Sequence, residues 1–201
     1  MSTAVLSLGS NVGDRLAHLQ GCVTMLGDCV RVVSPVYSTV PWKLAESGDT
    51  ASGAIENHVQ RDDVEQGDFL NAVLLVDDPD TDALEWLRRG QRCEAAAGRT
   101  REIRWGPRTL DVDVIDVRCG DSDELHRDDP DMTLPHPRAH QRAFVLVPWL
   151  DVAPSAVLPG HGPVAELVAA LPSAQLRGLR RRDDLVVHLA IRSPVRPWEV
   201  L

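Results

Sequence analysis

The sequence predicts an α+β protein with a ferredoxin-like (βαββαβ) arrangement: an antiparallel sheet, helices on one face, and C-terminal additions. Two observations lead to this fold class. Apolar segments follow one another as strand, helix, strand, strand, helix, strand, which is the split β-α-β pattern. The length of 201 residues, with 43% hydrophobic and 25% charged residues, suits one domain spanning 1–201.

The first three elements lie at the N-terminus. Ala4–Leu8 predicts a short apolar strand, and the turn-forming residues Gly9-Ser10-Asn11 end it. Asp14 begins a helix that runs to about Leu26, because apolar residues recur there at helical spacing. Val30–Tyr37 is rich in β-branched residues and predicts the second strand.

A long polar segment, residues 39–68, separates this half from the next. It lacks periodicity, and within it we interpret 43–67 as an inserted loop, because compact domains seldom contain loops of this length without a function. Phe69–Val76 predicts the third strand, which can pair antiparallel with Val30–Tyr37 across that loop.

The last elements of the repeat pattern follow directly. Asp80 or Thr81 is expected to cap a second helix, which Gly98 closes. Thr109–Val117 then alternates as the fourth strand.

The C-terminal part is a separate addition. Phe144–Leu150 is a further apolar segment, and an extension begins at about residue 160. We expect a short helix at Val164–Leu171 and a last strand at Leu185–Ile191, which together complete an outer layer.

Composition excludes several classes of protein. The net charge of −9 argues against a nucleic-acid-binding surface. No apolar run approaches 18 residues, so no membrane span is expected, and the N-terminus lacks the basic and apolar regions of a secretory leader. The four cysteines have no metal-ligand spacing, which favours reduced, buried thiols. We therefore expect a cytoplasmic protein, a monomer without nucleic-acid or membrane partners.

The most informative segment is Arg104–Ile115, which reads RWGPRTLDVDVI. Strand periodicity places Asp111 and Asp113 on one face, about 6.6 Å apart, where they repel by roughly 2–3 kcal/mol. A chain that keeps such a pair side by side usually has a cation there, although isolated Asp-x-Asp pairs are common and do not by themselves decide for a metal site. Arginines for binding phosphate lie close by in the sequence, at positions 99, 101, 104 and 108. Carboxylates for a hard metal beside guanidinium groups predict metal-assisted phosphoryl transfer.

Several other features are ambiguous when taken alone. Gly9-Ser10-Asn11 could hold an anion but is more often a tight turn. Gln91 and Glu94 share one helix face, as solvated residues commonly do. His136 lies between two prolines, as turn residues do, and Trp105 could pack in the core or stack on a base.

Six segments taken together resemble one known family. They occur in the family's order between residue 4 and about residue 160, and the RWGPRTLDxD block is highly specific. The segments are LSLGSNVGDR (Leu6–Arg15), VYSTVPW (Val36–Trp42), DFLNAV (Asp68–Val73), EAAAGRTR (Glu94–Arg101), Arg104–Ile115 and LPHPRAHQRAFVLVPW (Leu134–Trp149). The sequence resembles the 6-hydroxymethyl-7,8-dihydropterin pyrophosphokinases of folate synthesis.

The resemblance implies a reaction and an ATP site. Pyrophosphate would pass from ATP to the pterin hydroxymethyl group, releasing AMP, with two Mg²⁺ ions held by Asp111 and Asp113. Arg99, Arg101 and Arg108 match the family's catalytic arginines. The positions that match ATP-binding residues are Gln91, Glu94, Arg99, Arg108, Ile115, His136 and Arg142.

The resemblance also implies a pterin pocket. Asn71 matches the asparagine that hydrogen-bonds the pterin, and Phe144 matches the ring that stacks on it. The complete set of matching positions is Gly9, Ser10, Thr39, Pro41, Trp42, Phe69, Asn71, Trp105 and Phe144. The sequence departs from the family in its longer loop after Trp42 and in its last forty residues, which have no secure counterpart.

Two alternatives remain open at this stage. A two-metal phosphohydrolase could use Asp111 and Asp113, although it would require more ligands than the sequence offers. A ferredoxin-like RNA-binding module would require surface aromatic residues and a basic sheet, whereas aromatic residues make up 4% of the chain and its charge is negative.

Overall fold

The architecture was determined from a computed structural model. It describes residues 2–40, 67–99, 108–120, 123–124, 126–128 and 131–189. The predicted loop 43–67 therefore lies almost wholly outside the described residues, as does the loop that carries Arg101, Arg104 and Trp105.

The elements alternate between strands and helices in the N-terminal two thirds. In chain order they are β1 Ser2–Ser10, α1 Arg15–Leu26, η1 Gly27–Cys29, β2 Val30–Val33, β3 Tyr37–Thr39, β4 Phe69–Asp78, α2 Ala83–Ala96, β5 Asp111–Cys119, β6 Asp123–Glu124, β7 Arg127–Asp128, β8 Thr133–Leu134, η2 Ala139–Gln141, α3 Ala143–Val152, β9 Val157–Leu158, β10 Gly162–Pro163, α4 Val164–Ala170, α5 Ser173–Arg177 and β11 Leu179–Arg181. Asp14 caps α1 as expected, whereas Asp82 caps α2, two residues later than Asp80.

One antiparallel sheet organises the molecule. Its strand order is β11-β3-β4-β1-β5-β6, with β2 also pairing with β4. All of these pairs are antiparallel, which confirms the α+β class and the predicted pairing of the second and third strands. The predicted second strand is divided into β2 and β3, because Pro35 has no amide hydrogen for the ladder and Ser34 bonds Val73 through its side chain as well as its backbone.

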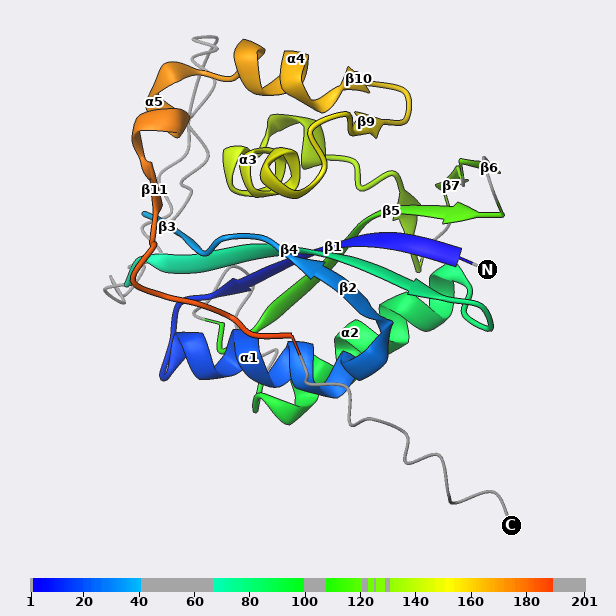
Figure 1. Ribbon diagram of the computed structural model, residues 1–201, viewed down its shortest axis with the longest axis horizontal. Helices are drawn as coiled ribbons and strands as arrows, with labels where there is room; N and C mark the ends of the chain where they lie inside the picture. Colours follow the sequence, from blue (N-terminus) through cyan, green and yellow to red (C-terminus); the bar gives the residue numbers. More distant parts are fainter. Residues whose placement is uncertain are drawn as a thin grey trace, which may run out of the picture.

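Helices cover both faces of the sheet (Figure 1): the two helices of the predicted unit, α1 and α2, share one face as expected, and the later helices α3 and α4 cover the other. Helices α1 and α2 pack on one side, against a core that includes Leu6, Leu8 and Val112. Helices α3 and α4 pack on the other, against Val5, Val73 and Ile115. Because both faces of the central strands carry apolar side chains, each face requires a covering layer.

The predicted orientation of the fourth strand is confirmed. Leu110, Val112 and Val114 are buried in the core beneath α1 and α2. A shift of register opposite Val5 and Leu6 leaves Ile115 as an extra residue of β5, buried against the α3 layer. Asp111 and Asp113 precede this bulge and keep the strict alternation that places them together.

The C-terminal part differs from the prediction in its strand. The apolar segment after Arg142 forms α3, and α4 lies where the short helix was expected. The predicted strand Leu185–Ile191 was wrong, because its described residues 185–189 form no ladder. Instead, β11 pairs with β3. Val187 packs in the core beside α1 and α2, and the backbone of His188 forms hydrogen bonds with the Gln20 side chain. Within the described residues no helix is both long and apolar enough to cross a bilayer.

Candidate functional site

A single row of residues crosses four strands of the sheet. Asp111 on β5 faces Gly9 on β1, Gly9 faces Asn71 on β4, and Asn71 faces Tyr37 on β3. Phe69 faces Thr39 one step further along. The register thus brings candidates for metal and for pterin binding to one end of the sheet, although they are far apart in the sequence.

Gly9 keeps the middle of this row open. A Cβ at this position would lie 3.6 Å from Asn71 Oδ1, 3.8 Å from Phe69 Cδ1 and 4.0 Å from the Cβ of Asp111. Any larger side chain would fill the space between the carboxylate and the amide. The glycine therefore keeps side-chain atoms out of the space between the Asp111 carboxylate and the Asn71 amide.

Cationic side chains surround the two aspartates. Arg108 forms an ion pair with Asp111, and Arg99 Nη1 lies 2.8 Å from Asp111 Oδ1. Arg142 Nη1 lies 3.0 Å from Asp113 Oδ2. The aspartate side chains remain 21% and 32% exposed, so they are open to exchange of partners.

His136 completes the cationic side of Asp113. Its Nε2 lies 3.9 Å from Asp113 Oδ2, while its Nδ1 accepts a hydrogen bond from the Arg138 amide. Burial lowers the pKa of His136, and the charge of Asp113 opposes that shift. An accepting Nδ1 places the proton of the neutral ring on Nε2, which faces the carboxylate.

Two hydrogen bonds link the backbone of Arg108 to Asn11, the residue that follows β1. The Arg108 amide donates to Asn11 Oδ1 at 2.7 Å, and the Asn11 amide donates to the Arg108 carbonyl at 3.1 Å. Sequence reasoning treated Asn11 only as part of a turn and missed this role. An asparagine directly after an apolar strand was the available signal, because its side chain commonly bonds nearby backbone.

The pterin candidates lie on the other half of the row. Asn71 is buried and donates through Nδ2 to Thr39 Oγ1 at 3.0 Å, which leaves its Oδ1 directed at the space above Gly9. Phe144 lies at the start of α3, and the Arg142 guanidinium is 5.6 Å from the centre of its ring. Arg142 therefore contacts both the carboxylate of Asp113 and the ring of Phe144.

The structure does not bring every candidate into this group. Ser10 is buried, with its hydroxyl 3.4 Å from His18 on the α1 side, and Ile115 is buried beneath α3, where its carbonyl accepts from the His136 amide. Gln91 is exposed on α2. The candidates Arg101, Pro41, Trp42 and Trp105 lie outside the described residues.

The donor set fits magnesium. Among the described residues there is no cluster of three or more side chains suited to hold a metal ion. Mg²⁺ prefers oxygen ligands and is commonly held by one or two carboxylates together with substrate phosphates, rather than by a complete protein cage. Asp111 and Asp113 supply such a pair, with guanidinium groups beside them for the phosphates.

Comparisons with known proteins point to one family. A family model for 7,8-dihydro-6-hydroxymethylpterin-pyrophosphokinase (HPPK) matches residues 5–154. A Mycobacterium bovis protein named 2-amino-4-hydroxy-6-hydroxymethyldihydropteridine pyrophosphokinase is 44% identical over 189 residues, covering 90% of this chain and 89% of its own. The protein of that name from Mycobacterium leprae is 45% identical, covering 98% and 97%.

Solved structures are similar in fold. A Plasmodium falciparum HPPK-DHPS crystal structure with pterin and p-hydroxybenzoate has a TM-score of 0.57 at 14% identity, covering 90% of this chain and 47% of its own. An HPPK-DHPS complex with substrates has a TM-score of 0.55, covering 84% and 43%. This chain thus spans under half of those longer chains. The family match over residues 5–154 confirms the resemblance read from the sequence: the chain belongs to the 7,8-dihydro-6-hydroxymethylpterin-pyrophosphokinase family.

Proposed function

We propose that the chain transfers pyrophosphate from ATP to the hydroxymethyl group of 6-hydroxymethyl-7,8-dihydropterin in folate biosynthesis, releasing AMP. Membership of the family and the names of its relatives support this reaction. The hydroxyl oxygen attacks the β-phosphorus of ATP, the bond from that phosphorus to the α–β bridging oxygen breaks, and AMP leaves with that oxygen. The hydroxyl proton is released.

The arginines would serve the triphosphate. Arg99 and Arg108 are held at Asp111, and Arg142 is held at Asp113. We propose that these guanidinium groups exchange carboxylate for phosphate oxygens when ATP binds. A guanidinium can donate two parallel hydrogen bonds to a planar carboxylate or to a tetrahedral phosphate. Arg101 would join them from its loop.

Asp111 and Asp113 would then hold magnesium. We propose two ions, as the family resemblance implies, with Gln91 and His136 at the nucleotide side. Bound magnesium supplies positive charge to the phosphoryl oxygens, where negative charge develops. The two carboxylates hold it in place, and the chain's own contribution is largely positioning.

The pterin would lie over Gly9. Asn71 Oδ1 can accept a hydrogen bond from the ring edge, and Phe69 and Phe144 offer flat surfaces for stacking. Thr39 orients Asn71 by accepting its Nδ2 hydrogen. From the resemblance we add Pro41, Trp42 and Trp105 to this pocket. No described side chain is an obvious general base, and we propose that a carboxylate of the metal site or solvent accepts the hydroxyl proton.

We also assign the β1-to-β5 part of the sheet to a ferredoxin-like unit. The observed order β3-β4-β1-β5, with helices after β1 and β4, supports this topology. The elements from β9 onward would form the C-terminal extension of a single domain, and we propose that the protein acts as a monomer.

The observation that supports the proposal most strongly is the row that joins Asp111, Gly9 and Asn71 across three strands. The decisive experiment mixes pure protein with ATP, Mg²⁺ and 6-hydroxymethyl-7,8-dihydropterin and measures AMP. Pterin-dependent AMP is expected. Phosphate released from ATP without pterin would instead indicate the phosphohydrolase, which the family match does not favour.

A further inference from the structure

The start of helix α3 carries two candidate substrate contacts and lacks a cap of its own. Arg142 occupies the N-cap position, and a guanidinium has no acceptor for the first amides of the helix. Phe144, the candidate stacking ring, is the second residue of the helix. Ala143 lies between these two residues and is buried, so its amide requires an acceptor from elsewhere in the protein.

Gln175 supplies this acceptor from the C-terminal extension. Its side-chain Oε1 accepts a hydrogen bond of 3.3 Å from the Ala143 amide, across 32 residues of sequence. Gln175 lies in α5, and its own amide donates to the Pro172 carbonyl at 2.9 Å, in the first turn of that helix. A side chain from a distant helix thus takes the role that an N-cap serine, aspartate or asparagine has in most helices.

The segment that carries Gln175 is anchored to the sheet. Helix α5 leads directly into β11, which pairs with β3 so that Leu179 faces Thr39 (Figure 1). Leu176 and Leu179 also pack against the same core as α3. Because the sheet and this core hold α5 in place, the Gln175 side chain is a fixed point to which the start of α3 is attached.

The far end of α3 is attached to the same edge of the sheet. Asp151 lies in the last turn of the helix, and its Oδ2 accepts a hydrogen bond of 2.6 Å from the Tyr37 hydroxyl on β3. Arg181 on β11 lies 3.4 Å from the same oxygen. Helix α3 is therefore held at both ends by β3, α5 and β11, and Gln175 makes the contact at the end that carries the candidate substrate contacts.

We propose that Gln175 is a positioning residue, which holds the Ala143 amide and thereby fixes the start of α3 and the direction of the Phe144 ring for stacking on the pterin. This rests on the proposed function. Gln175 acts through the helix backbone and not by contact with a substrate. The effect should be larger on the pterin than on ATP, because the long Arg142 side chain can follow the phosphates whereas a stacked ring requires its backbone in place.

Two variants separate the oxygen acceptor from the shape of the side chain. Gln175→Glu keeps an oxygen acceptor at the same distance, and its negative charge suits the N-terminus of a helix. Gln175→Met keeps the length of the side chain, but a thioether is only a weak acceptor. Gln20→Met is the matched control, because it makes the same change on α1, where Gln20 bonds the backbone of His188 on the opposite face of the sheet.

AMP formation gives kcat and the KM of each substrate, and hydrogen exchange of the Ala143 amide, measured by NMR, reports the hydrogen bond itself. Gln175→Met should speed this exchange about tenfold. It should raise the KM for the pterin about tenfold, less than the roughly hundredfold loss that a displacement of 1 Å can cause. Its KM for ATP should stay within about threefold of wild type, and Gln175→Glu and Gln20→Met should stay within about threefold in every measurement.

Three results would overturn the proposal. The first is faster exchange in Gln175→Met with a normal KM for the pterin, which would make the hydrogen bond purely structural. The second is an equal rise of both KM values, and the third is an equal impairment of Gln175→Glu and Gln175→Met. An Ala143 amide that exchanges equally fast in wild type and Gln175→Met would contradict the hydrogen bond. A wild-type protein that forms no pterin-dependent AMP would instead contradict the proposed function.

Discussion

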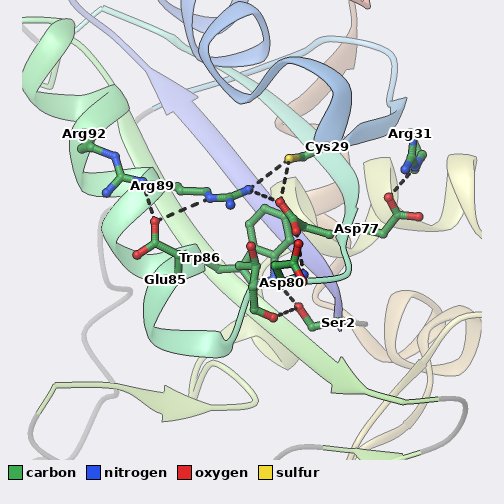
Figure 2. Close-up of polar contacts among 11 residues, drawn as sticks. Ser2, Cys29, Arg31, Asp77, Asp80, Glu85, Trp86, Arg89 and Arg92 are labelled. Carbon is green, nitrogen blue, oxygen red and sulfur yellow. Dashed lines mark hydrogen bonds and ion pairs between the residues drawn. The ribbon is translucent and has the colours of Figure 1, made fainter. Parts of the chain in front are cut away.

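Helix α2 carries an arginine–carboxylate cluster near each end, and the two clusters differ in what holds their acids. The site cluster consists of Glu94, Arg99, Arg108, Asp111, Asp113 and Arg142. The remote cluster consists of Cys29, Asp78, Asp80, Glu85, Trp86, Arg89 and Arg92. Figure 2 labels all of these residues except Asp78. Both contain similar numbers of charges, so composition alone does not distinguish them.

The remote cluster is tied to the backbone. Asp78 accepts a hydrogen bond of 2.8 Å from the Asp80 amide, and Arg89 Nη1 lies 2.9 Å from its other oxygen. Arg89 also lies over the Trp86 ring, 5.0 Å from its centre, and contacts the Cys29 sulfur. The amide of Asp80 and the guanidinium of Arg89 lower the pKa of Asp78 to about 2.

In the site cluster the two aspartates are held by side chains, whereas Glu94 accepts a hydrogen bond from the Val112 amide. Among the described residues, the partners of Asp111 and Asp113 are guanidinium groups and an imidazole. A guanidinium can exchange a carboxylate for a phosphate, whereas a backbone amide within a turn cannot leave its acceptor without local unfolding. The comparison teaches that the candidate metal ligands Asp111 and Asp113 have partners that a phosphate could replace, whereas Asp78 of the remote cluster is fixed in part by the backbone.

The largest effect should come from the site acids. Asp111→Ala and Asp113→Ala should each lower turnover at least about 100-fold, because each removes a carboxylate that we propose holds magnesium against the reacting phosphates. AMP formation measures turnover, and urea unfolding measures stability. Near-normal turnover in either variant would contradict the metal assignment. The site cluster would then have no functional difference from the remote cluster.

Gly90→Ala tests whether a shift of helix α2 affects the aspartates of the site cluster. The added Cβ would meet Val112 Cγ1 at 2.9 Å, so the helix must shift and the free energy of unfolding should fall by about 1–3 kcal/mol. Glu94 moves with the helix and accepts a hydrogen bond from the amide of Val112, the residue between Asp111 and Asp113. The Mg²⁺ concentration needed for half-maximal AMP formation should therefore also rise. Gly21→Ala, on α1 with open space around it, is the matched control: it should raise the free energy of unfolding by about 0.5–1 kcal/mol, because alanine favours the helix, and leave the Mg²⁺ requirement unchanged. An unchanged Mg²⁺ requirement in a destabilised Gly90→Ala would mean that the helix does not transmit its position to the aspartates.

Arg89→Ala should have a smaller effect, confined to stability. It removes the contact with the Trp86 ring and the partly buried ion pair with Asp78, which together contribute about 1 kcal/mol. Turnover should stay within about threefold of wild type, because Arg89 contacts no residue of the site cluster in the described structure. A large loss of AMP formation in a folded variant would erase the distinction between the clusters.

Local sequence patterns predicted much of this molecule. They predicted little about which distant segments become neighbours in the fold. The alternation of Leu110, Val112 and Val114 gave the buried face of β5 and hence the shared face of Asp111 and Asp113. The role of Asn11 and the contact of Glu94 with Val112 depend on which segments meet in space, and no local periodicity records that. The family resemblance supplied Glu94 but not Asn11 as a site residue, and the role of Glu94 stays a prediction.

The C-terminal strand shows the same limit. Leu185–Leu189 alternates as a strand would, yet its backbone bonds to the Gln20 side chain because α1, and no strand, lies beside it. Leu179–Arg181 has weaker strand character and forms β11 because the edge of β3 is available to it. In both segments, the element that lies beside the chain decided whether a strand formed.

The smallest effect should be a dependence on pH in the remote cluster. The pKa of Asp78 in the folded protein is about 2, below its ordinary value of 3.8, so the stability it contributes is present above about pH 4 and is lost as pH falls towards 2. Asp78→Asn lacks this ionisation. Its free energy of unfolding, measured in urea, should therefore lie below that of wild type at pH 6 and approach it at pH 2. A difference that stays constant from pH 6 to pH 2 would mean that the carboxylate is not held by charge and backbone in the folded state, and that the two clusters are alike after all.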